Sequence, residues 1–323
     1  MSDLFRFLKS AAICFLLLVI LDIAGGLFFN KAYESLPTDY LTAICKAKNA
    51  MNTDAEVVIF GSSRASYHYE SALLKDSLNN LLNVNYNVYN AGVDGKNITF
   101  HSSIYQYMLK KNTPEIVILD INPFEFTKRF NVVEDLGVYY FKDAYIRDVI
   151  NSFDYKNRIL MYSNLFRYNT IGVKISTMYL LSKKGYEPST DGFRPLPEDI
   201  NPPSDITIEE QKIIKEDPIE DINVRCFQDF IKWSKEKNIK LIISLSPEYY
   251  PNTTSPNLEN TSSLKIIKEI CENNNIPIYD DRFHNKISTN ALFFRDEAHM
   301  NKSGAREYSK YFFNRIKNEF LNM

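Results

Sequence analysis

Short apolar runs alternate with longer amphipathic stretches along the chain from residue 56 onward. The runs predict strands at residues 56–60, 87–90, 116–119, 241–245 and 276–279. Helical periodicity predicts helices at residues 71–82, 98–111, 222–237, 263–272 and 303–318. Strands that are apolar throughout and separated by helices are typical of a parallel sheet covered on both faces. The pattern therefore predicts a doubly wound α/β domain with a parallel sheet of about five strands.

A longer apolar run, residues 11–29, follows Arg6 and Lys9 near the N-terminus. It is long enough to cross a bilayer as one helix, and the basic residues indicate a cytoplasmic N-terminus. A cleaved signal peptide is the alternative, because Ala24 and Gly26 are small residues of the kind that a peptidase requires. We favour the uncleaved anchor, because the run exceeds the ~7–15 residues of a typical signal core. Both interpretations place the rest of the chain outside the cytoplasm, in the periplasm or at the cell surface.

Asp22 lies inside this apolar run. A carboxylate at the centre of a bilayer costs about 2.5–3.5 kcal/mol, so it needs a polar partner. One interpretation is a contact with a partner membrane protein, which Gly25 and Gly26 would allow to approach closely. The other is that Asp22 lies near enough to the outer surface to reach water.

The chain divides into three predicted parts. Residues 1–30 form the cytoplasmic tip and the transmembrane anchor, residues 31–55 form a tether with weak periodicity, and residues 56–323 form the α/β domain. Aromatic-rich helical pieces and a proline-rich loop interrupt the α/β alternation at residues 123–221. We interpret this segment as a helical insertion that shapes or covers the cleft.

Charge and cysteine usage exclude several classes of function. The formal charge is −2, and the charges are intermixed without a basic stripe, so nucleic acid is not an expected partner. The four cysteines show no Cys-x-x-Cys spacing and no companion histidines, so no metal or other cofactor is expected. Cys14 lies in the anchor, and the other three are odd in number. At least one free thiol is expected, although an oxidising compartment would permit one disulfide.

Three polar segments directly follow predicted strands: Gly61-Ser62-Ser63, Asn90-Ala91-Gly92 and Asp120-Ile121-Asn122. The carboxyl ends of parallel strands share one edge of the sheet, which is where ligands bind in such folds. A serine on the first of these turns would lie at a helix N-terminus, where exposed amides stabilise a developing oxyanion. The alternative is that Ser62 and Ser63 only cap the helix.

Asp296 and His299 lie three residues apart in a polar loop that precedes the last predicted helix. This spacing allows the carboxylate to hold one ring nitrogen while the other faces the cleft. A hydroxyl becomes a good nucleophile only when an oriented imidazole takes its proton, so the pair supplies what a catalytic serine needs. A surface loop with a solvated histidine is the alternative.

Two further residues near the serine are candidates for substrate binding. Arg64 could hold an anionic or carbonyl group of a substrate, or could form a salt bridge at the start of the helix. His68 could line the cleft, or could be a packed histidine.

The order of these motifs resembles the SGNH (GDSL-type) hydrolase superfamily over most of residues 56–323. The resemblance implies a flavodoxin-like fold with Ser63 as the nucleophile, Asp296 and His299 as the element before the last helix, and Gly92 and Asn122 as oxyanion donors. No residue in this set implies a cofactor.

The first and third motifs depart from the family pattern. Gly-Ser-Ser-Arg stands in place of Gly-Asp-Ser-Leu, which is similar to the membrane-anchored branch that works beside membrane-bound O-acyltransferases on cell-envelope polymers. Asp120-Ile121-Asn122-Pro123 stands in place of Gly-x-Asn-Asp. Without Asn122, the oxyanion would rest on the backbone amides of Ser63 and Gly92.

The resemblance implies a membrane-anchored, extracytoplasmic serine esterase or O-acyltransferase that forms an acyl-serine intermediate. The expected substrates are acyl esters, foremost acetyl, of envelope or capsular saccharides. Water as the second acceptor gives an esterase and a sugar hydroxyl gives a transferase; no residue decides between them. The alternative from another class is a non-catalytic accessory protein that docks to a membrane-bound acyltransferase or a polysaccharide exporter through the anchor and Asp22. A saccharide-binding module without chemistry is a third interpretation.

Overall fold

The computed structural model describes residues 2–37, 42–127, 132–180, 189–197, 218–250, 261–284 and 286–321. The chain forms two compact units. The helical unit comprises Met1–Pro37 and Asn131–Tyr186, and the α/β unit comprises Thr38–Phe130 and Glu187–Met323. The predicted boundaries at residues 30, 55, 123 and 221 stay predictions.

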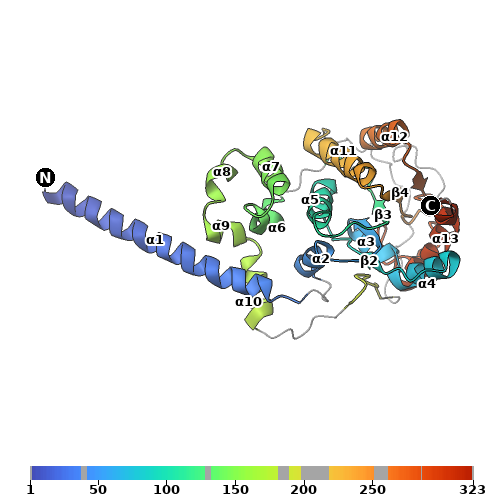
Figure 1. The fold of residues 1–323 in the computed structure, drawn as a ribbon, viewed down its shortest axis with the longest axis horizontal. Coiled ribbons are helices and arrows are strands. Elements are labelled where there is room, and N and C mark those ends of the chain that lie inside the picture. Colours follow the sequence, from blue (N-terminus) through green and yellow to red (C-terminus); the bar gives the residue numbers. More distant parts are fainter. Residues whose placement is uncertain are drawn as a thin grey trace. The chain divides into compact units, whose positions relative to one another are not determined.

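A five-stranded parallel sheet forms the centre of the α/β unit (Figure 1). Its strands are β1 (Val57–Gly61), β2 (Val88–Asn90), β3 (Ile116–Asp120), β4 (Lys240–Leu245) and β5 (Ile278–Asp280). They are hydrogen-bonded in the order β2-β1-β3-β4-β5, which is the flavodoxin-like doubly wound arrangement. Every residue of β1, β2 and β3 is buried, which explains why these strands are apolar throughout. The predicted fold class is confirmed.

Helices cover both faces of this sheet. They are α2 (Ala43–Ala50), α3 (Ser63–His68), α4 (Ser71–Leu82), α5 (Ile98–Met108), α11 (Asp221–Glu236), α12 (Ser262–Asn274) and α13 (Lys302–Phe320), with a 3-10 turn η2 (Ala291–Phe293). Strand β1 shows the two faces, because its side chains alternate. Ile59 belongs to the core cluster that contains Leu78 of α4 and Phe312 of α13. Phe60 packs its ring at 5.5 Å from Tyr105 of α5 and at 5.7 Å from Phe230 of α11.

Helix α2 lies in the segment that was expected to be a tether. Thr42 caps it by accepting a hydrogen bond from the Cys45 amide, and Cys45, Lys46 and Ala47 are buried. The buried Lys46 ammonium donates to Ser66 Oγ at 2.9 Å. The helix has only eight residues and carries two lysines, so its sequence shows no apolar stripe. Periodicity therefore missed it.

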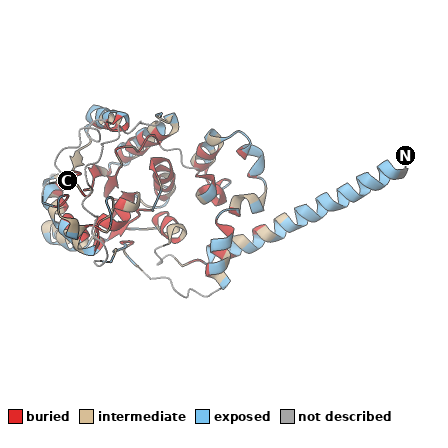
Figure 2. Ribbon diagram, turned by 180° about the vertical axis from the view of Figure 1, so that it is seen from behind, coloured by how far each residue is buried: buried red, intermediate tan, exposed pale blue. Residues whose placement is uncertain are grey.

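The helical unit begins with α1 (Ser2–Glu34), and its other helices are short. They are α6 (Val133–Leu136), η1 (Gly137–Tyr139), α7 (Ala144–Phe153), α8 (Asn157–Leu160), α9 (Asn164–Tyr168) and α10 (Gly172–Leu180). Residues 3–21 of α1 are exposed, whereas Gly26, Ala32 and Tyr33 are buried against this unit, as Figure 2 shows. Among the described residues, α1 is the one helix long and apolar enough to cross a membrane, a property that signal sequences share.

Asp22 of α1 contacts the start of α9. Its carboxylate accepts hydrogen bonds from Ser163 Oγ at 2.6 Å and from the amides of Asn164 and Leu165 at 2.9 Å each. The Asn164 side chain adds a further hydrogen bond at 2.9 Å. The two sequence interpretations of Asp22 assigned these hydrogen bonds to a partner protein or to water. The chain itself supplies them, from the donors at a helix N-terminus.

All four cysteines are free thiols. Cys14 is exposed on α1, and Cys45, Cys226 and Cys271 are buried. The expected free thiol is therefore present, and the optional disulfide is not formed.

Candidate active site

Ser63 is the first residue of α3, on a tight turn at the carboxyl end of β1. Gly61 makes this turn with φ +144°, and a Cβ atom there would lie 2.5 Å from the Asp120 carbonyl oxygen and 2.8 Å from the Ala65 Cβ. Only glycine fits this conformation and this space. The turn leaves Ser63 partly exposed, while the rest of α3 is buried.

His299 contacts Ser63 from the loop between η2 and α13. Its Nε2 lies 2.8 Å from Ser63 Oγ, although the two residues are 236 positions apart. On the other side of the ring, Nδ1 lies 2.9 Å from both carboxylate oxygens of Asp296. Asp296 Oδ1 also accepts the backbone amides of Ala298 and His299 at 2.9 Å each, so the loop folds around this carboxylate. The structure brings together the three residues that the sequence proposed as nucleophile, base and orienting carboxylate.

The electrostatics of this triad define the proton positions. Burial raises the pKa of Asp296, but the hydrogen bonds from His299 and Ala298 and the nearby imidazole outweigh it, so the net pKa is lowered. Asp296 is therefore a carboxylate at neutral pH, and a carboxylate only accepts hydrogen bonds. With a carboxylate facing Nδ1, the tautomer that this geometry accommodates carries its proton on Nδ1, which leaves Nε2 as the acceptor for the Ser63 hydroxyl.

A cavity of about 120 Å³ lies beside Ser63. Its lining residues are Ser62, Ser63, Gly95, Lys96, Asn97, Asn122, Phe124 and Glu125. Asn122 follows β3 as expected, and its Oδ1 accepts the Phe124 amide at 2.8 Å. This bond fixes the side-chain amide, whose Nδ2 group has no hydrogen-bond partner within the described part of the chain. A donor is thus available on the same cavity as the Ser63 hydroxyl.

Gly92 does not line this cavity. Its amide donates to Asn90 Oδ1 at 3.0 Å, so the expected oxyanion donor is already engaged. A Cβ atom at Gly92 would lie 2.4 Å from the Ser66 amide nitrogen, which gives this glycine a packing reason to be present. Gly95, at φ +69°, lies on the cavity instead.

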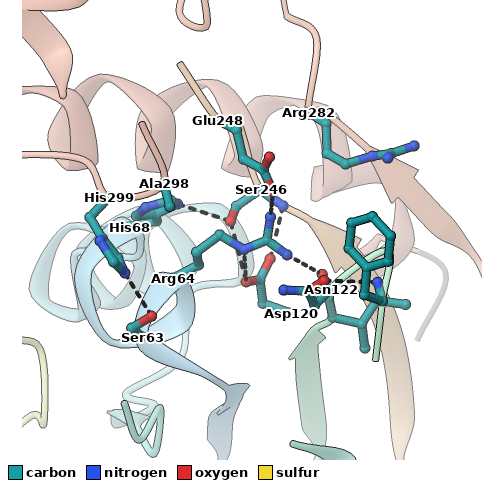
Figure 3. A network of polar contacts seen from close by, with 12 residues as sticks. Ser63, Arg64, His68, Asp120, Asn122, Ser246, Glu248, Arg282, Ala298 and His299 are labelled. Atoms are coloured by element: carbon teal, nitrogen blue, oxygen red, sulfur yellow. Dashed lines mark hydrogen bonds and ion pairs between the residues drawn. The ribbon is translucent and has the colours of Figure 1, made fainter. Parts of the chain in front are cut away.

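Arg64 is also placed differently from the substrate-binding role that was considered for it. The side chain is only 3% exposed. Its guanidinium pairs with Glu248, donates to the Ile121 carbonyl at 2.7 Å and lies 3.9 Å from Asp120 (Figure 3). The alternative of a salt bridge near the start of the helix describes this geometry.

His68 is fully buried and is not among the residues that line the cavity, and Figure 3 shows its contact with Ser246. Its Nε2 accepts the Met300 amide at 3.0 Å, and its Nδ1 lies 2.9 Å from Ser246 Oγ. Ser246 in turn donates from its hydroxyl at 3.2 Å and from its amide at 2.9 Å to Asp120. A buried polar network therefore runs from Asp120 through Ser246 and His68 to the residue that follows His299.

The charge state of this network follows from its burial. Burial, followed by the charge of Arg64 and the nearby His299 ring, lowers the pKa of His68 well below the usual range, and a hydrogen bond with the Ala298 backbone partly opposes this effect. The ring is therefore neutral, with its proton on Nδ1, because Nε2 accepts from Met300. Burial also raises the pKa of Asp120, and the Arg64 charge and the hydrogen bonds from Ser246 and Tyr69 oppose this effect.

Sequence reasoning missed several residues around Ser63. Ser246 lies just after β4, at the same sheet edge as the other polar segments, so the strand-end rule could have found it. Tyr67 packs edge-on against His299 with ring centroids 5.3 Å apart, and its hydroxyl donates to Asp94. Glu125 lines the cavity and accepts hydrogen bonds from the Ile98 and Asn122 amides. The sequence shows no signal for Tyr67 or Glu125, because neither lies at a strand end or in a motif.

Comparisons with known proteins add the following findings. No family model and no curated protein matches the chain. Among solved structures, the psychrotrophic esterase EstA from Pseudoalteromonas sp. is 12% identical with a TM-score of 0.43, over 83% of this chain and 98% of that one. The acetyl xylan esterase AlAXEase is 14% identical with a TM-score of 0.41, over 80% and 99%. A catalytic variant of Axe2, an acetylxylan esterase from Geobacillus stearothermophilus, is 12% identical with a TM-score of 0.42, over 82% and 94%. Similarity at these levels assigns neither a family nor an activity.

Proposed function

We propose that the protein is a serine esterase or O-acyltransferase of the SGNH type, which acts on acyl esters through an acyl-serine intermediate. The observation that carries this proposal is the continuous path of hydrogen bonds from Ser63 Oγ through His299 to Asp296. A serine that only caps its helix does not need an imidazole oriented by a carboxylate.

In the proposed reaction, His299 first accepts a proton from Ser63 and later returns one. Ser63 Oγ attacks the ester carbonyl carbon while His299 Nε2 takes its proton, and Asp296 holds the Nδ1 proton of the resulting imidazolium. The ester C–O bond then breaks, the leaving alkoxide takes the proton from His299, and the acyl group stays on Ser63. Water, or a sugar hydroxyl, attacks the acyl-serine and passes its proton through His299 back to Ser63 Oγ. The first acceptor gives hydrolysis and the second gives acyl transfer.

The cavity beside Ser63 supports a short acyl group and one side-chain oxyanion donor. At about 120 Å³ it suits an acetyl group better than a long chain. Asn122 Nδ2 is the side-chain donor on this cavity, and the Ser63 amide is the backbone donor of the same turn. A donor of this kind contributes when it points at the position of the oxyanion. Gly92 is not part of this proposal, because its amide is engaged.

We also propose that α1 is an uncleaved membrane anchor and that the α/β unit is extracytoplasmic, where it meets envelope or capsular saccharides. Removal of the first 26 residues would delete Asp22 and its hydrogen bonds to α9, and would also delete the buried Gly26. A segment that contributes such contacts to a folded unit is a poor candidate for removal. This packing supports the anchor over the signal peptide.

Labelling of the purified full chain with a fluorophosphonate probe tests the activity. We expect wild-type protein to react, and Ser63→Ala and His299→Ala to lose the reaction. Ser62→Ala is the matched control, because Ser62 is the neighbouring serine and makes no side-chain capping bond, so this variant should be labelled like wild type. Unlabelled protein is then incubated with O-acetylated oligosaccharides, and acetate release is compared with transfer to an unacetylated acceptor.

Folded wild-type protein that does not react, or a Ser63→Ala variant that still reacts, would overturn the proposal. The accessory role would then be the better hypothesis, with the anchor docking to a membrane-bound acyltransferase. In cells that role predicts that Ser63→Ala leaves function intact.

A further inference from the structure

A group of exposed apolar side chains lies on α8, α9 and the turns beside them. Tyr155, Ile159 and Tyr162 are each more than 70% exposed, and Leu160 and Leu165 are each 41% exposed. We call these five residues the α8–α9 edge. So many large apolar side chains within eleven residues leave a surface that water solvates poorly, and such patches mark interaction sites.

The position of the α8–α9 edge along α1 indicates what covers it. Asp22 holds the first turn of α9 through four hydrogen bonds, which places the end of the edge that contains Leu165 at a known position along α1. Figure 1 shows α8 and α9 on the side of the helical unit that faces the N-terminal end of α1. The two helices that carry the edge therefore lie toward the apolar, exposed part of α1.

The length of the apolar run in α1 determines how deep Asp22 and the start of α9 lie in a bilayer. The twelve residues between Lys9 and Asp22 span only about 18 Å, whereas the hydrocarbon core is about 30 Å thick. The whole run 11–29 is needed to cross it, so Asp22 lies seven residues, or about 10 Å, inside the outer end of the run. The start of α9 must then lie at membrane depth as well, because it is bonded to Asp22.

The polar groups of this segment fit such a depth. A carboxylate and free helix amides are costly in hydrocarbon unless they satisfy each other, and Asp22 and the α9 N-terminus do so. The side chains that point outward there are the apolar and tyrosine residues of the edge. Lys156 and Arg158 are exposed next to it, and basic and tyrosine side chains are typical of the lipid headgroup level.

A cavity of about 250 Å³ in the helical unit shows the same change from apolar to polar. Ile23 and Leu27 line it on α1, together with Asn30, one helical turn further from the N-terminus. Lys142 and Arg167 also line it. Cationic and amide groups thus appear at the level where α1 leaves its apolar run.

We propose that the α8–α9 edge is a membrane-binding surface, which inserts its apolar side chains into the outer leaflet of the bilayer that α1 crosses. The inference rests on the proposal that α1 is an uncleaved anchor. The helical unit would then contact lipid at two places, through α1 and through the α8–α9 edge.

Quenching of tryptophan fluorescence by bromine-labelled lipids tests this surface. The chain has one tryptophan, so Trp233→Phe gives a background in which Ile159→Trp and Tyr162→Trp report on the edge. The full chain is reconstituted into phosphatidylcholine–phosphatidylglycerol vesicles that carry bromines near the headgroup end of the acyl chains. Leu17→Trp reports on the anchor, and Asp148→Trp, an exposed position on α7, is the control within the same unit.

We expect Ile159→Trp and Tyr162→Trp to be quenched at least about half as strongly as Leu17→Trp, as for interfacial helices, and Asp148→Trp to be quenched little. Quenching of Leu17→Trp without quenching of the edge would overturn the inference and leave the anchor intact. An edge that resists both lipid bromine and aqueous iodide would also overturn it, and would indicate a protein partner. If Leu17→Trp is not quenched, the anchor and this inference fail together, while fluorophosphonate labelling still tests the activity separately. Circular dichroism confirms that each variant is folded.

Discussion

His299 and His68 lie in the same part of the α/β unit but in opposite environments. The His299 side chain is 27% exposed, and its Nε2 faces the Ser63 hydroxyl. His68 is fully buried, and both of its nitrogens are engaged, one by a backbone amide and one by Ser246. The carboxylates beside them differ in the same way, because Asp296 is half exposed and Asp120 is buried. Residue type alone therefore does not define a role; a proton-transferring histidine needs one nitrogen left for the reacting group.

The largest loss of activity is expected when the Asp296 carboxylate, which orients His299, loses its charge. Asp296→Asn offers an amide where His299 needs a carboxylate, so the ring loses the preference for the Nδ1 proton that frees Nε2. We expect kcat/KM on an activated acetyl ester to fall by about 10⁴-fold, in line with loss of a triad carboxylate. The free energy of unfolding should change by less than about 1 kcal/mol, because the side chain is half exposed.

Steady-state kinetics of this variant measures the change in kcat/KM, and urea unfolding measures the change in the free energy of unfolding. A variant that keeps its activity would place Asp296 outside the chemistry. It would also remove the contrast between the exposed pair and the buried network.

A smaller loss of activity is expected when His68, in the buried network with Ser246 and Asp120, is replaced. His68 positions His299, because it holds the amide of Met300, the next residue in the chain. His68→Leu removes both hydrogen bonds, and we expect about 2–3 kcal/mol of destabilisation from the unpaired groups. Because the imidazole of His299 is then less well placed, kcat should fall about tenfold with little change in KM.

Two comparison variants separate positioning from general destabilisation. His68→Gln can still accept from Met300 and donate to Ser246, so it should recover most of the fluorophosphonate labelling rate. Leu78→Ala removes a core side chain of α4 and should destabilise the unit without slowing the labelling. If Leu78→Ala and His68→Leu slow labelling equally, His68 has only a structural role.

Arg64 should affect stability and hardly affect catalysis. Arg64→Met leaves Glu248 and Asp120 without their buried partner, and we expect a loss of about 3 kcal/mol in the free energy of unfolding. KM for a neutral acetyl ester should stay within about twofold, since the guanidinium does not reach the cavity. A large rise in KM with unchanged stability would restore the substrate-binding interpretation.

The sequence predicted the α/β unit well because its signals are regular. Five apolar runs and five amphipathic stretches became β1 to β5 and α4, α5, α11, α12 and α13, each within a few residues of the predicted bounds. The contact between Asp296 and His299 was predictable from their three-residue spacing, whereas their position beside Ser63 was predicted from the resemblance in motif order and not from local geometry.

What the sequence did not predict depends on contacts between distant residues. The hydrogen bond between the Gly92 amide and the Asn90 side chain cannot be predicted from the hydrophobic periodicity of the sequence. The same is true of the burial of His68 against Ser246. Asp22 was recognised as needing a partner, but its donors on α9 lie about 140 positions away. Short helices such as α2 and α9 are stabilised by tertiary contacts of this kind more than by their own propensity.

The smallest expected effect is a pH dependence of stability that arises from Glu125, which lines the cavity. Burial raises the pKa of Glu125 to about 7, against the lowering effect of the Asn122 and Ile98 amides and of Arg64. The folded state therefore holds a proton that the unfolded chain releases near pH 4.5, the ordinary value for this group. The stability contributed by this group is present below pH 4.5 and is lost as the pH rises through 7.

Glu125→Gln mimics the protonated side chain at every pH and so removes this dependence. Relative to wild type, the variant should gain about 1–3 kcal/mol in the free energy of unfolding between pH 5 and pH 8, at 1.36 kcal/mol per pKa unit. Urea unfolding of both proteins at the two pH values measures the difference. Parallel pH profiles would mean that Glu125 is charged in the folded protein. A negative charge would then lie on the cavity where the oxyanion is proposed to form, and Lys96, which lines the same cavity, would have to offset it.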